Sequence, residues 1–170
     1  PESSWQGCNV LGIVAPTVEA ATQTPWAVNS PQYPQKYNTD LVAVFGTTRT
    51  ITSGVYPEEI SKRCPKVTVV QQVCATLAGA IEEEAQETEL DRLVEKGIQA
   101  VLAQTKGTPP HRAILGCTHF SLVEHLFRRH LPPFTRILSQ PGVVADSFED
   151  YVTRHPRYVS EDHPGVRRLT

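Results

Sequence analysis

The feature that most constrains the fold of this chain is an alternation of short apolar runs with segments of helical periodicity. The apolar runs show little polar–apolar alternation, which is typical of strands buried on both faces of a parallel sheet. These runs cover residues 10–14, 41–45, 67–71, 113–117 and 137–138. Segments of helical periodicity cover residues 17–22, 47–63, 75–85, 87–105, 121–130 and 143–154. The pattern therefore predicts an α/β fold, a parallel sheet flanked by helices.

Local signals predict where two of the helices begin or break. Pro57 falls inside residues 47–63 and should kink or split that helix, because proline removes a backbone donor. The helix over residues 87–105 has a continuous apolar stripe, and Thr88 with Asp91 has the spacing of a capping box at its start. We therefore expect a broken helix after the second apolar run and a long, regular one later.

Composition argues against several classes of function. The net charge is −2 and the sequence pI is about 6.3, so the chain lacks the basic surface expected of a nucleic-acid-binding protein. No apolar run is long enough to span a bilayer, and the N-terminus carries no secretory signal. The four cysteines lack the Cys-x-x-Cys spacing of a zinc or dithiol site. Reduced thiols in a cytoplasmic protein are therefore expected.

Both ends of the sequence look cut. The chain contains no methionine, and it opens on Pro1-Glu2-Ser3-Ser4. Residues 166–170 read as the start of a further strand. We therefore expect these 170 residues to be a piece of a longer protein.

The segment Gly116-Cys117-Thr118-His119 has the composition of a thiol site. Cys117 ends an apolar run just before a predicted helix, where backbone N–H groups and the helix dipole favour a thiolate. His119, two residues on, could exchange a proton with it, and Thr118 could bind a substrate carboxylate. Such a thiolate can act as a base or a nucleophile. On composition alone, a buried structural cysteine is the commoner explanation.

A second loop, residues 46–54, places Gly46 after a strand and then a hydroxyl-rich helix start that begins with Thr47. Such a loop can hold an anion at the helix N-terminus. It lacks the lysine and the spacing of a P-loop. Taken alone, N-capping and close packing of helix on sheet explain it better.

Together the two loops resemble the aspartate/glutamate racemase superfamily, and glutamate racemase most closely. Residues 116–121 match its Gly-Cys-Thr-His-Tyr-Pro motif except at Phe120 and Ser121. Residues 44–56 resemble its Gly-Thr-x-x-Thr-x-x-Ser-Gly-x-Tyr segment at the expected distance. Weaker matches cover residues 11–16, 73–82 and 151–156. The resemblance extends from about residue 10 to residue 170.

The resemblance implies a function and roles for five residues. Members of this family interconvert L- and D-glutamate with two cysteines that flank the substrate, use no pyridoxal phosphate or metal, and supply D-glutamate for peptidoglycan. Cys117 matches the second of these cysteines and His119 the histidine that assists it. Thr118 and His119 match substrate-binding residues. Glu82 matches a supporting glutamate, although a solvated member of an acidic run explains it equally well. Thr47 is expected in a supporting role.

The family fold implies a domain assignment. Two similar α/β domains enclose the active site, so residues 16–138 would be most of the second domain, and residues 1–15 and 139–170 pieces of the first. The first cysteine should precede the strand at residues 10–14 by a whole helix and is therefore expected outside the chain. Cys8 lies too close to that strand to replace it. The chain alone is expected to be inactive, and an apolar sheet domain without its partner could self-associate as a homodimer.

Three alternatives remain open at this stage. The first is a racemase or isomerase that acts on aspartate or a related diacid. The second is a Cys–His hydrolase or acyl transferase, which would need an oxyanion hole and an orienting residue. The third is a non-catalytic α/β module that binds a dicarboxylate.

Overall fold

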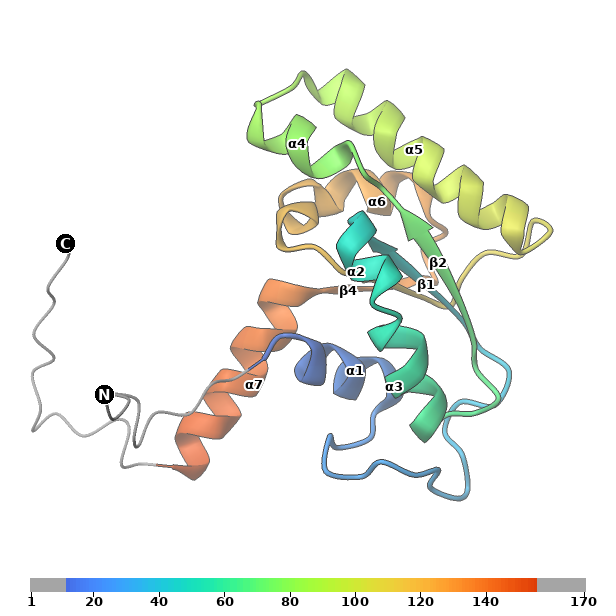
Figure 1. Cartoon of the computed structure of the whole chain (residues 1–170), viewed down its shortest axis with the longest axis vertical. Coiled ribbons are helices and arrows are strands. Elements are labelled where there is room, and N and C mark those ends of the chain that lie inside the picture. The colour runs from blue at the N-terminus through green and yellow to red at the C-terminus, as the bar shows by residue number, and fades with distance from the viewer. Residues whose placement is uncertain (1–11, 156–170) are drawn as a thin grey trace, which may run out of the picture.

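The computed structural model describes residues 12–155 and contains one four-stranded, fully parallel sheet (Figure 1). The order of the strands across the sheet is β2-β1-β3-β4. Their bounds are β1 Leu41–Gly46, β2 Thr68–Val73, β3 Arg112–Leu115 and β4 Arg136–Ser139. The predicted fold class is confirmed, and the four apolar runs after residue 40 are strands, with ends shifted by at most two residues.

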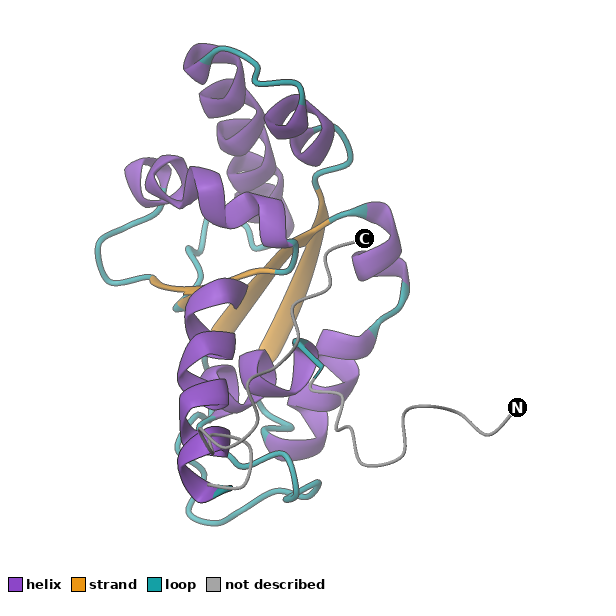
Figure 2. Cartoon of the chain, turned by 90° about the vertical axis from the view of Figure 1, so that its left-hand side faces the viewer, coloured by secondary structure: helices purple, strands orange, loops and turns teal. Residues whose placement is uncertain are grey.

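Helices cover both faces of this sheet (Figure 2). On one face lie α4 (Leu77–Glu82), α5 (Glu87–Gln104) and α6 (Glu124–His130), and on the other lie α1 (Val14–Thr22), α3 (Val55–Arg63) and α7 (Gln140–Arg154). Alternate residues of β1 supply the two cores: Ala43 and Phe45 face α5, while Val42 and Val44 face α1 and α3. Every residue of β1 is buried, so a continuous apolar run is what this central strand requires.

The helix expected over residues 47–63 is divided, but not at Pro57. It consists of α2 (Thr48–Thr52) and α3, separated at Gly54, whose φ is +65°. Glycine adopts this left-handed conformation without the steric cost that a side chain incurs. Pro57 lies in the first turn of α3, where a missing N–H costs no helical hydrogen bond.

The strand predicted at residues 10–14 is wrong where the structure describes it. Val14 is the first residue of α1, three residues earlier than the helix was expected to begin, and residues 10–11 lie outside the described residues. Val14, Val18 and Ala21 repeat at helical spacing and pack together in the core beneath the sheet. The apolar run is therefore part of an amphipathic helix, because a run of this length does not distinguish strand from helix.

The capping box predicted at Thr88 and Asp91 is also wrong. Gln86 precedes α5 without a side-chain cap, and Thr88 lies within the first helical turn. The Asp91 carboxylate instead accepts hydrogen bonds from Arg129 at 3.0 Å and His130 at 2.9 Å. Asp91 thus joins α5 to α6 rather than capping its own helix.

Other boundaries differ by a few residues. The segment expected as a helix from Ser121 begins as a 3₁₀ helix, η1 (Thr118–Val123), and continues as α6. Residues 23–37 form a loop without helix or strand. Within residues 12–155, no helix is long and apolar enough to cross a membrane.

Candidate active site

The two loops singled out from the sequence meet at the carboxyl edge of the sheet. The strands are parallel and β1 pairs with β3, so the segments that follow these strands leave from adjacent points. The Gly116 amide donates to the carbonyl of Phe45 at 2.7 Å, and the Thr50 hydroxyl donates to the carbonyl of Gly116 at 3.3 Å. These bonds fix the start of the Cys117 segment against the end of β1.

Both loops need glycine for this close approach. A Cβ at Gly116 would lie 3.2 Å from the carbonyl oxygen of Phe45, and one at Gly46 would lie 3.1 Å from the side chain of Thr50. Both distances are tighter than ordinary van der Waals contact with carbon or oxygen. Gly116 is therefore explained by packing between the two loops, and Gly46 by packing within its own loop.

Thr47 caps α2, as the hydroxyl-rich sequence indicated. Its side-chain oxygen accepts from the Thr50 amide at 3.4 Å and lies 3.1 Å from the Thr50 hydroxyl. The geometry gives Thr47 a structural role at the edge of the site. Its partly exposed side chain also lies on the loop that meets the Cys117 segment.

Cys117 lies in extended backbone between β3 and η1, with φ −137° and ψ 134°. Its side chain is half-buried, and its Sγ lies 3.7 Å from Nδ1 of His119. That distance is within the range of a sulfur hydrogen bond, so a proton can pass between thiol and imidazole. The structure thus brings together the pair that the sequence predicted.

The other ring nitrogen of His119 faces Glu82. Nε2 lies 3.0 Å from Oε1 of Glu82, the last residue of α4. Glu82 is therefore paired with the imidazole and does not face solvent alone. A carboxylate in this position fixes the orientation of an imidazole ring. Thiol, imidazole and carboxylate form one continuous chain across two elements.

Thr118 lies beside this chain and is exposed. Its carbonyl accepts a hydrogen bond from the Ser121 hydroxyl at 2.6 Å, which holds the first turn of η1. Its own side chain is open to solvent. Cys8, rejected above as a replacement for the first cysteine, lies outside the described residues.

Two further cysteines are present in the described part of the chain, and both are buried. Burial raises the pKa of the Cys74 thiol to about 12, and burial also raises that of Cys64. These groups remain protonated at neutral pH and are poor bases or nucleophiles. Among the described cysteines, Cys117 alone combines access to solvent with an adjacent base.

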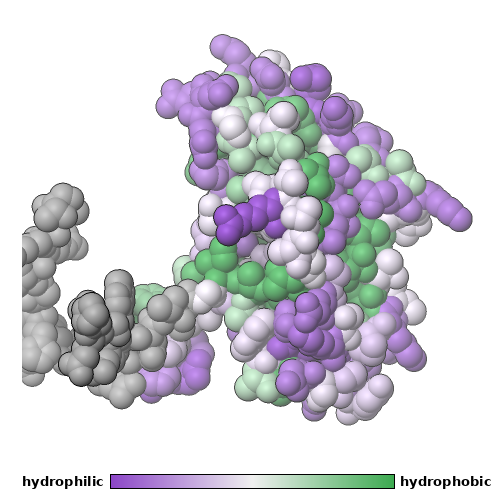
Figure 3. All heavy atoms as spheres, in the orientation of Figure 1, coloured by the Kyte–Doolittle hydropathy of each residue, from purple (hydrophilic) through white to green (hydrophobic). Residues whose placement is uncertain are grey.

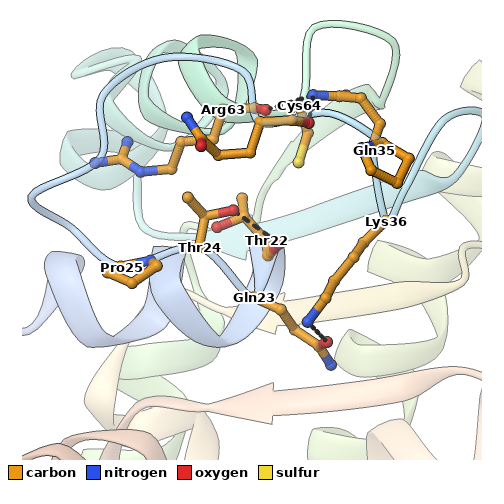
Figure 4. A pocket seen from close by; sticks show the side chains of 10 residues that line it. Thr22, Gln23, Thr24, Pro25, Gln35, Lys36, Arg63 and Cys64 are labelled. Atoms are coloured by element: carbon orange, nitrogen blue, oxygen red, sulfur yellow. Dashed lines mark hydrogen bonds between the residues drawn. The ribbon is translucent and has the colours of Figure 1, made fainter.

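A cavity of about 140 Å³ lies elsewhere, between α1, the loop after it and the end of α3 (Figure 4). Its walls include Thr22, Lys36, Arg63 and Cys64. Because Lys36 and Cys64 precede β1 and β2, this cavity lies toward the amino edge of the sheet, opposite the Cys117 segment. Within residues 12–155, no group of three or more histidine, cysteine or acidic side chains could hold a metal ion.

Comparison with known proteins finds sequence relatives among the glutamate racemases. The chain is 43% identical over 162 residues to the glutamate racemase of Phenylobacterium zucineum, a match that covers 95% of the chain and 56% of that protein. The chain is a homologue of the glutamate racemases. It spans about half the length of the curated racemases that it matches. No family model matches the chain.

Solved glutamate racemases share the fold. An isoform from Bacillus anthracis superposes with a TM-score of 0.68 at 22% identity, covering 87% of this chain and 50% of that one. The enzyme from Francisella tularensis, solved in complex with D-glutamate, superposes with a TM-score of 0.64 at 16% identity, covering 85% of this chain and 47% of that one. At these identities the structural similarity establishes only the shared architecture. The homology to glutamate racemases rests on the sequence identity to the curated proteins.

Proposed function

We propose that this chain supplies one half of the active site of a glutamate racemase that needs neither pyridoxal phosphate nor metal, with Cys117 as one of two acid–base thiols. The observation that carries the proposal is the chain from Cys117 through His119 to Glu82, located where two loops meet at the carboxyl edge of the sheet. It is found in a homologue of glutamate racemases.

The chemistry follows from what racemisation requires. One group removes the proton from the α-carbon of the amino acid, and another delivers a proton to the opposite face. A thiolate at Cys117 accepts the α-proton in one direction of the reaction, and the thiol donates it in the other. His119, 3.7 Å away, holds or returns the sulfur's proton, and Glu82 keeps the imidazole oriented.

The substrate is held by groups that surround the thiol. The exposed Thr118 hydroxyl is proposed to bind a carboxylate of glutamate, with Thr47 in support on the neighbouring loop. We propose that the D-glutamate formed supplies peptidoglycan synthesis in the cytoplasm.

The second thiol is proposed to lie outside residues 1–170, on the opposing domain. In this proposal residues 16–138 form most of one domain, and residues 1–15 and 139–170 belong to the other. Figure 3 shows apolar surface near the place where α7 approaches α1, and Phe148 of α7 is 56% exposed. Such surface is consistent with a covering domain or with association into a homodimer.

The test follows the optical activity of L-glutamate and L-aspartate with the full-length gene product and with residues 1–170 alone. The proposal predicts racemisation of glutamate by the full-length protein and none by the shorter chain. Faster turnover of aspartate would reassign the substrate. Turnover by residues 1–170 that is lost on Cys117→Ser would contradict the half-site, and would give Cys8 the role of the second thiol.

A further inference from the structure

Tyr56 is a buried polar side chain behind the thiol loop to which the proposed reaction assigns no role. It lies in the first turn of α3 and is 1% exposed. Burial raises the pKa of its phenol, and hydrogen bonds from Gln140 and Thr17 oppose that rise. The phenol is therefore neutral and is available as both a donor and an acceptor.

The phenol joins three helices. Nε2 of Gln140, the first residue of α7, donates to the Tyr56 oxygen at 2.8 Å, and both side chains are buried. The Thr17 hydroxyl of α1, also within reach of the phenol, donates to the carbonyl of Ile13 at 2.8 Å. Tyr56 thus links α3 to α7 by a hydrogen bond and lies beside Thr17 of α1.

The ring of Tyr56 lies against the turn that carries the thiol. A Cβ at Gly116 would lie 3.4 Å from Cε2 of Tyr56. Gly116 immediately precedes Cys117, and its amide and carbonyl are already bonded to Phe45 and Thr50. The Tyr56 ring is therefore a third contact of this turn, beside the two hydrogen bonds.

Gln140 reaches the same place from the neighbouring strand. Leu115, at the end of β3, pairs with Ser139, at the end of β4, so Gln140 and Gly116 leave adjacent strands at the same level. A change in the direction of α7 would therefore reach the turn through Gln140 and Tyr56. On the other side of the thiol loop, Glu82 of α4 contacts His119.

We propose that Tyr56, held by Gln140, is a positioning residue that fixes the Gly116 turn and thereby the distance from the Cys117 sulfur to the His119 ring. The consequence for rate rests on the proposed racemase function, whereas the consequence for the turn does not. Tyr56 does not touch the reacting atoms. Its effect on catalysis is through geometry, to which acid–base steps are sensitive.

The test uses Tyr56→Phe, which keeps the ring and removes only the hydroxyl. The matched control is Thr135→Val, which likewise deletes one buried hydroxyl. The Thr135 hydroxyl donates to the carbonyl of Pro110 at 2.7 Å. Thr135 precedes β4 and Pro110 precedes β3, so this pair lies at the opposite edge of the sheet. Both variants lose one buried hydrogen bond and should unfold at lower urea concentrations.

Hydrogen–deuterium exchange of the Gly116 and Cys117 amides in the full-length gene product gives the first readout. Tyr56→Phe should speed this exchange about tenfold, which is the change expected when a local opening becomes about 1.4 kcal/mol easier, and Thr135→Val should leave it unchanged. Equal exchange at these amides in the two variants would overturn the positioning role, whatever the activity of the protein.

Kinetics give the second readout. Tyr56→Phe should lower kcat for glutamate about tenfold with little change in KM, and Thr135→Val should lower neither. Gln140→Leu added to Tyr56→Phe should cause little further loss, since both act on one contact. Fast exchange at Gly116 with an unchanged kcat would show that the turn is held by Tyr56 but that its position does not limit the reaction. A wild-type protein that does not racemise glutamate would refute the proposed function alone.

Discussion

Two cysteines follow strands that flank β1, and their surroundings differ in every respect that matters for chemistry. Cys74 follows β2 directly and is 8% exposed, packed so closely on α5 that a Cβ at Gly97 would lie 3.1 Å from its sulfur. Cys117 follows β3, is partly exposed, and has an imidazole 3.7 Å away. A place at the carboxyl edge of a parallel sheet is thus insufficient for a thiol site. Access and a partnered base are also needed.

The largest expected difference between these cysteines is in reactivity. With a pKa of about 12, Cys74 is only about 10⁻⁴ thiolate at pH 8. Iodoacetamide should therefore modify Cys117 more than about a hundredfold faster than Cys74 in the folded protein, as measured by mass spectrometry of tryptic peptides. In denaturant the two rates should converge. Equal labelling under native conditions would contradict the distinction.

The packing that covers Cys74 can be tested at Gly97. Gly97→Ala should destabilise the fold by about 1–3 kcal/mol, because the added methyl meets the Cys74 sulfur and the Phe45 ring. Gly79→Ala is the control, since a Cβ there meets no atom within 4 Å in the interior of α4. It should stabilise the protein by about 0.5–1 kcal/mol. Urea unfolding measures both, and similar effects from the two changes would show that Cys74 is loosely covered.

The partner of the Cys117 site can be tested at Glu82. Glu82→Gln keeps the shape but removes the charge that faces His119, so kcat for glutamate should fall about tenfold in the full-length gene product. Glu83→Gln changes the next residue of the same acidic run and should leave kcat within about twofold. Identical kinetics for the two variants would return Glu82 to the role of a solvated surface charge. Its 60% exposure means that salt should weaken the pairing.

The sequence was sufficient for the sheet because its signals are local and redundant. Four apolar runs, separated by helical stripes, predict a parallel sheet whatever the exact boundaries. The strand prediction for residues 10–14 was wrong because an apolar run of that length fits a helix as well. Val14 lies on the buried face of α1. The helix break was predicted but misplaced, since Gly54 rather than Pro57 takes the turn.

The site was predictable in part. Cys117 and His119 are two residues apart, so their proximity follows from spacing alone. The Glu82–His119 pair depends on how α4 and η1 pack on the sheet, which no local pattern determines, so the sequence left Glu82 undecided. The Tyr56–Gln140 bond joins residues 84 positions apart, and nothing in the spacing of either residue indicated it.

The central claim is that Cys117, unlike Cys74, exchanges a proton with the substrate α-carbon. Proton NMR of L-glutamate in D₂O, with the full-length gene product, measures this directly as loss of the α-proton signal. The account predicts rapid exchange in the unsubstituted protein and in Cys74→Ala once corrected for the folded fraction, with a loss of about a thousandfold or more in Cys117→Ser. Exchange that persists in Cys117→Ser at an undiminished rate would contradict it.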